Sequence, residues 1–79
     1  MKVQVLFFGA TADAVGEREV EFDLPEDAKA DQVFVEIVKT YPQLNRHKLL
    51  FALNQEYVEG DETIKPNDEL AVFTAVSGG

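Results

Sequence analysis

Hydrophobic positions alternate with polar ones in two segments near the start of the chain. Residues 2–8 begin by alternating and end fully apolar, which predicts a central strand covered on both faces. Residues 17–24 alternate cleanly and predict a half-exposed strand that returns antiparallel to the first. Between them, Thr11 is expected to cap a short helical turn that Gly16 ends.

One segment, residues 30–41, has a helical hydrophobic period instead. Its apolar residues recur three and four positions apart, so they form one buried stripe. Pro42 marks the helix end, because a residue before proline avoids the helical region. The start is less clear, since either Asp27 or Asp31 could cap it. The stripe consists of Val33, Phe34, Ile37, Val38 and Tyr41.

The rest of the chain predicts a polar loop and three further strands. Residues 42–48 are the polar loop, and residues 49–53 are a short apolar strand. A turn at residues 54–55 leads into Tyr57 and Val58, which indicates a hairpin. Residues 69–76 form the last strand, apolar on both faces like the first, so these two are expected to be adjacent in the sheet.

The order strand, strand, helix, strand, strand, strand predicts an α+β fold of the β-grasp (ubiquitin-like) type. In this fold a mixed sheet carries one main helix across a face. The helix provides the crossover that a parallel pairing of the first and last strands requires. We expect a single domain over residues 1–79, with residues 76–79 as an extended C-terminal tail.

Composition narrows the possible functions. The net charge of −8 argues against a nucleic-acid surface, which needs clustered Lys and Arg. The acidic residues gather in 17–31 and 56–69, either as a solvated surface or as a face that steers the domain to a basic partner. No apolar run approaches a membrane span, and we expect a cytoplasmic location.

Side-chain chemistry is sparse. Cysteine is absent and His47 is the only histidine, so we expect no disulfide, no metal site and no histidine-based triad. His47 lies between Arg46 and Lys48 and is expected to be an exposed loop residue.

The sequence ends on Gly78 and Gly79, and the terminal carboxylate of Gly79 is the group with a plausible reaction. A glycine end can pass through a channel too narrow for any side chain. The four residues from Val76 span roughly 13 Å if extended, enough to reach into a partner's active site. We therefore expect Val76, Ser77, Gly78 and Gly79 to insert there, and Phe7, Phe73 and Val76 to form the apolar partner interface.

Several segments in order resemble the small subunits of molybdopterin synthase, a family of ubiquitin-like sulfur carriers. The resemblance spans almost the whole chain. It lies in Val5–Phe8 with the loop to Glu17, Tyr41–Pro42, Leu53–Val58, Asn67–Glu69 and Val72–Gly79.

The resemblance implies a non-catalytic, sulfur-donating subunit of a sulfurtransferase. Gly79 would be adenylated by an adenylyltransferase like the ubiquitin-activating enzyme, and a sulfur donor system would convert it into a thiocarboxylate. The tail would then enter the large subunit, in a complex of two large and two small subunits. There it would donate sulfur to cyclic pyranopterin monophosphate, giving molybdopterin for the molybdenum cofactor. ATP would be used by the activating enzyme, with no cofactor held by this chain alone.

One departure from the family pattern affects the tail. Thr74 and Ala75 stand where family members often have two prolines, so we expect this segment either to be more flexible or to pair further along the sheet. Three alternatives remain open from sequence. They are a sulfur carrier for thiazole (thiamine) synthesis, a protein modifier conjugated through Gly79, and a binding module with an inert tail.

Overall fold

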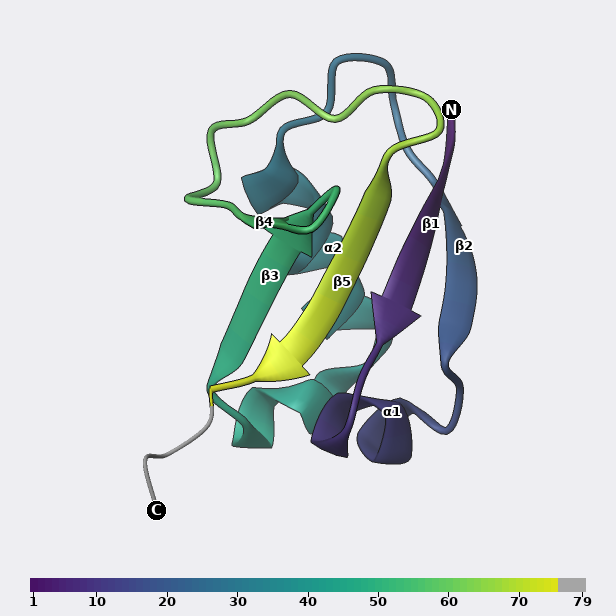
Figure 1. The fold of residues 1–79 in the computed structure, drawn as a ribbon. Helices are drawn as coiled ribbons and strands as arrows, with labels where there is room; N and C mark the ends of the chain where they lie inside the picture. Colours follow the sequence, from purple (N-terminus) through teal and green to yellow (C-terminus); the bar gives the residue numbers. More distant parts are fainter. Residues whose placement is uncertain (76–79) are drawn as a thin grey trace.

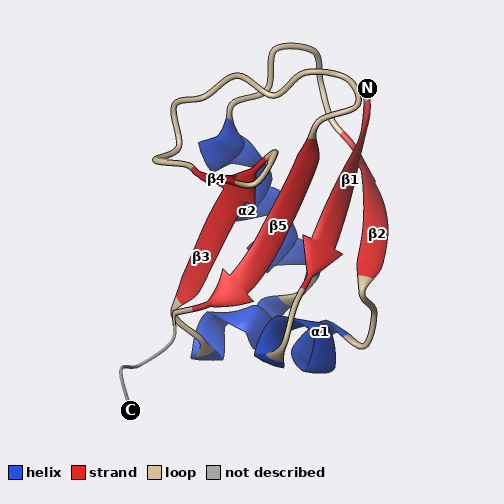
Figure 2. Cartoon of the chain, in the orientation of Figure 1, coloured by secondary structure: helices blue, strands red, loops and turns tan. Residues whose placement is uncertain are grey.

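The computed structural model describes residues 1–75, which form a five-stranded mixed sheet with helices on one side and at one end (Figures 1 and 2). The strands are β1 (Lys2–Phe7), β2 (Glu19–Asp23), β3 (Leu49–Leu53), β4 (Glu56–Tyr57) and β5 (Glu69–Thr74). The helices are α1 (Ala10–Val15), α2 (Ala30–Thr40) and a 3-10 helix, η1 (Pro42–Arg46).

Strand β5 is the centre of the sheet, whose order is β2-β1-β5-β3-β4. It pairs in parallel with β1, where Phe7 lies opposite Val72, and antiparallel with β3, where Leu50 lies opposite Phe73. Strand β2 returns antiparallel to β1, as expected. This arrangement is the β-grasp topology that the order of elements predicts.

Helix α2 crosses one face of the sheet and closes the core (Figure 1). Its fully buried residues are Ala30, Val33 and Ile37, and the helix ends at Thr40, ahead of Pro42, as predicted. The sheet contributes alternate residues of β1 and β5 to the same core. These are Val3, Val5, Phe7, Leu70 and Val72.

The structure corrects the prediction that β1 is covered on both faces. Because α2 lies on one face only, residues of the opposite face remain accessible to solvent. Lys2 and Gln4 are exposed on β1, and Phe8 directly after it is 51% exposed. The apolar residues on that second face are therefore uncovered rather than buried.

Two local predictions are also wrong. Thr11 does not cap α1: Gly9 is the N-cap residue, without a side-chain cap, and Thr11 lies inside the helix. The segment expected to be a polar loop contains η1, whose Leu44 is fully buried. A single apolar residue among polar ones gives no hydrophobic periodicity from which such a short helix could be predicted.

Neither aspartate caps α2. Lys29 is its N-cap residue, and the Lys29 amide donates to Gln32 Oε1 at 2.8 Å. The ammonium group of Lys29 cannot accept a hydrogen bond, so the reciprocal half of a capping box cannot form. The Lys29 side chain instead donates to Thr63 Oγ1 at 2.7 Å.

The carboxylate of Glu62 orders the loop beside the start of α2. It accepts the amides of Gly60 at 2.8 Å and Glu59 at 3.1 Å. Hydrogen bonds from backbone amides, first that of Gly60, lower the pKa of Glu62 from its ordinary value. The loop is joined to the helix, because Gly60 O accepts the Asp31 amide at 2.9 Å.

This geometry predicts a pH dependence of the loop. A depressed folded-state pKa contributes stability above the unfolded pKa, and that stability is lost as pH falls through the folded pKa of Glu62. A carbon-13 NMR titration should give a Glu62 midpoint below that of the same residue in the urea-unfolded chain. Equal midpoints would show that the two amide bonds do not favour the ionised form.

Candidate functional site

The base of the C-terminal tail is held on one side by β3. Thr74 lies opposite Leu49, and the Ala75 amide donates to Lys48 O at 2.9 Å. The departure at residues 74–75 thus leads to further pairing along the sheet, one of the two outcomes expected. A proline at position 75 has no amide proton and could not make this bond.

On its other side, β5 loses its neighbour after Val72. Strand β1 ends at Phe7, opposite Val72, and the chain turns away at Gly9, whose φ is 57°. Val72 O still accepts two donors, the Phe8 amide at 3.1 Å and the Thr11 hydroxyl at 2.8 Å. From Phe73 onward β5 therefore pairs with β3 alone.

The uncovered face of the sheet has an apolar patch beside this tail base. A hollow on it is lined by residues of β3, β4, β5 and the end of β1. Tyr57 and Phe73 contact each other with ring centroids 5.7 Å apart, and Phe8 and Tyr57 are 51% and 72% exposed. Aromatic side chains of this kind are enriched where partner proteins bind. The open-face patch comprises Phe8, Ala52, Gln55, Tyr57, Ala71 and Phe73.

The structure separates the three residues predicted for the partner interface. Phe7 is 2% exposed and packs edge-to-face on Tyr41 at 5.7 Å, so it belongs to the core, the other role its apolar strand position allowed. Phe73 lies in the open-face patch. Val76 lies outside the described residues.

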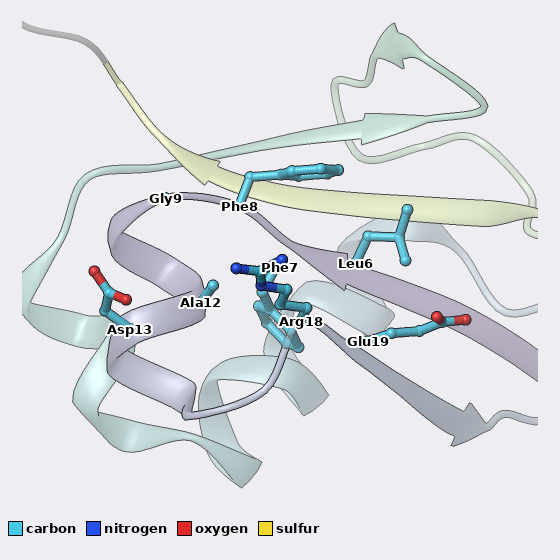
Figure 3. A pocket seen from close by; sticks show the side chains of 8 residues that line it. All are labelled: Leu6, Phe7, Phe8, Gly9, Ala12, Asp13, Arg18 and Glu19. Carbon is cyan, nitrogen blue, oxygen red and sulfur yellow. The ribbon is translucent and has the colours of Figure 1, made fainter.

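Sequence reasoning missed Phe8 and Tyr57 as interface candidates. Figure 3 shows Leu6 and Phe8 on one side of β1 and Phe7 on the other. The sequence did contain a signal for Phe8, because the alternation along β1 places Phe8 on the face opposite the buried residues of that strand. Tyr57 follows an Asn54-Gln55 turn, where both residues have positive φ, and the register places it opposite Ala52.

A second hollow lies between α1 and the ends of β1 and β2 (Figure 3). Its polar side chains are those of Asp13, Arg18 and Glu19. They form neither a pairing of nucleophile and base nor a cluster of metal ligands; no group of three such ligands occurs within residues 1–75. This hollow therefore offers no catalytic constellation.

The expected reactive group and its lead, Val76, Ser77, Gly78 and Gly79, lie outside the described residues. What the structure does establish is the start of that lead. Strand β5 is the last element before it in the sequence, and two residues of the open-face patch, Ala71 and Phe73, lie on this strand. Within the described residues, no helix has the length and apolar character needed to cross a membrane.

The five-stranded mixed sheet with one main helix across a face defines a ubiquitin-like β-grasp fold. The ThiS family model matches residues 5–79. The chain therefore belongs to the ThiS family. The region that the family model matches extends over the two terminal glycines.

Individual relatives agree with the family. The human molybdopterin synthase sulfur carrier subunit is 40% identical, with 99% of this chain and 94% of that protein covered. SAMP1 from Haloferax volcanii, small archaeal modifier protein 1, has a similar solved structure with a TM-score of 0.88 and 27% identity, each chain being fully covered.

A third similar structure is a complex. It contains subunits 1 and 2 of the molybdopterin-converting factor from Helicobacter pylori, with a TM-score of 0.72 and both chains fully covered. At 21% identity this likeness concerns the fold alone.

Proposed function

We propose that this chain is the sulfur carrier subunit of a molybdopterin synthase and acts in the cytoplasm. The observation that carries the proposal is that the central strand β5, the last element before the Gly78–Gly79 end of the sequence, contributes Ala71 and Phe73 to an exposed apolar patch. The 40% identity to the human sulfur carrier subunit, over nearly the whole of both chains, supports the pathway.

The reaction at the C-terminus begins with activation of the Gly79 carboxylate, which is a poor acylating agent. A carboxylate oxygen of Gly79 attacks the α-phosphorus of ATP, the bond to the β-phosphate breaks, and pyrophosphate leaves. The resulting acyl-adenylate has an electrophilic carbonyl carbon. Hydrosulfide from a sulfur donor system adds there, loses its proton, and expels AMP, which gives the thiocarboxylate. The activating adenylyltransferase binds the ATP, so this chain supplies only the carboxyl group.

The partner that receives the sulfur is the large subunit of the synthase. The open-face patch docks on it, and residues 76–79 enter its active site, which holds cyclic pyranopterin monophosphate. The large subunit carries the catalytic residues, and within residues 1–75 of the small subunit no group of three potential metal ligands occurs. Two large and two small subunits form the complex. The small subunit is thus a carrier and a substrate rather than a catalyst.

Reconstitution tests this assignment. The thiocarboxylated chain, mixed with a molybdopterin synthase large subunit, should convert cyclic pyranopterin monophosphate into molybdopterin with one sulfur lost per carrier. The unmodified chain is the matched control and should give no product. A thiocarboxylated chain that supports thiazole formation but not molybdopterin formation would assign the carrier to thiamine synthesis instead.

A protein modifier is the second candidate, because the SAMP1 structure has the same fold over its whole length. In that reaction a lysine amine of a target protein displaces AMP from Gly79 and forms an amide. High-mass conjugates that require Gly79 would support it. Their absence, together with sulfur transfer, supports the carrier.

A further inference from the structure

The Thr11 hydroxyl joins three backbone groups at the junction of β1 and β5. It lies 2.8 Å from Phe8 O and 2.8 Å from Val72 O, and it accepts the Phe8 amide at 3.0 Å. Thr11 is fully buried, and it is the one buried polar side chain in the described part of the sequence. A hydroxyl has a single proton, so it donates to one carbonyl at a time while it accepts from the amide.

These three groups belong to the two parts of the proposed site. Phe8 lies in the open-face patch, and Val72 immediately precedes Phe73, the patch residue from which the strand leads to the tail. Beyond Val72 no β1 residue pairs with β5. The hydroxyl therefore links the docking patch to the tail base at the last point where the two strands meet.

We propose that Thr11 is a positioning residue that keeps the open-face patch and the base of the tail in fixed register. This inference rests on the proposed function. When a partner protein binds Phe8 and Phe73, the position of the patch determines where the tail base lies relative to that partner. The carbonyl carbon of Gly79 must then reach its reaction partner, and a misplacement of about 1 Å can cost about 100-fold in rate.

The hydroxyl is not required for folding, because each backbone group has a second partner. Without it, Phe8 N still donates to Val72 O at 3.1 Å, and Phe8 O still accepts the Thr11 amide at 3.2 Å. Valine has nearly the same shape as threonine. Thr11→Val should therefore fold, keep the direct Phe8–Val72 bond and lose only the bonds of the hydroxyl, whereas Thr11→Ser should retain them.

The test measures sulfur acquisition with the activating enzyme, ATP and hydrosulfide, and separates binding from transfer. Thr11→Val should lower the rate constant at saturating enzyme about 10-fold and change the dissociation constant less than about threefold. Thr11→Ser should remain near the wild-type rate. Ile64→Val, which removes one methyl group from a fully buried residue in the loop before β5, is the control for general destabilisation. It should leave the rate unchanged.

A second readout does not depend on activity. In Thr11→Val, amide hydrogen exchange should accelerate at Phe8 and at Ala75 and stay unchanged at Val5, in the middle of β1. The inference is overturned if neither amide responds, if Thr11→Val acquires sulfur at the wild-type rate, or if Ile64→Val loses as much activity. A wild-type chain that never acquires sulfur would contradict the proposed function instead, and the exchange result would still decide whether Thr11 links patch and tail.

Discussion

Deletion of Gly79 is expected to abolish sulfur acquisition and leave the fold intact. The truncated chain ends in the carboxylate of Gly78, one residue, or roughly 3.5 Å, short of the reacting position. A displacement of that size exceeds the tolerance of an acyl-transfer site, so the rate should fall by more than about 100-fold. Intact-mass spectrometry after incubation with the activating enzyme, ATP and hydrosulfide measures the effect.

The matched control for this deletion is the melting temperature. Strand β5 ends at Thr74 and the last described backbone bond is made by Ala75, so the deletion removes none of the described contacts of the sheet. We expect an unchanged thermal midpoint. A truncated chain that still acquired sulfur at the wild-type rate would show that the reaction does not depend on the position of the terminal carboxylate.

Phe8→Ala is expected to weaken binding of the synthase large subunit by at least about 30-fold, the loss of one aromatic anchor worth about 2 kcal/mol. The ring is half exposed and lines the same hollow as Phe73 and Tyr57, and Phe8 does not belong to the hydrophobic core that α2 covers. Isothermal titration calorimetry with the purified large subunit gives the dissociation constant.

Val35→Ala is the control for Phe8→Ala. Val35 is an exposed apolar residue, 61% accessible, but it lies on α2, across the sheet from the patch. Its removal should leave the affinity unchanged. Equal losses in the two variants would place the docking surface elsewhere, and no loss in either would exclude the open face from the interface.

The strands and the main helix could be predicted because their side chains have clear periods. The stripe from Val33 to Tyr41 and the alternation of Val20 and Phe22 specify which face of each element is buried. Pro42 and Gly16 mark ends for local steric reasons, and the structure has the helix end and the left-handed Gly16 where expected.

The coverage of the sheet could not be predicted in the same way. An apolar residue at the end of a strand looks the same in sequence whether a helix covers it or a partner protein does. Phe7 and Phe8 are adjacent and chemically identical, yet one is 2% exposed and the other 51%. Only the side on which α2 crosses decides between them, and that is a tertiary property.

The role of Thr11 was also hidden from sequence. A threonine near a predicted helix start suggests a cap, since its side chain often bonds a nearby amide. Here the hydroxyl bonds Val72, which is 61 residues away, through a contact that no local pattern encodes. The bond from Ala75 to Lys48 is long-range in the same sense, and it explains how the tail base is held without the expected prolines.

Intact-mass spectrometry of the wild-type chain is the most direct test of the carrier proposal. The chain is incubated with its activating enzyme, ATP and hydrosulfide, and fragmentation locates any change along the sequence. We expect a gain equal to the mass of sulfur minus oxygen, confined to Gly79 and absent without ATP. An unchanged mass in the presence of active enzyme, or a sulfur adduct elsewhere in the chain, would contradict the proposal that Gly79 carries the sulfur.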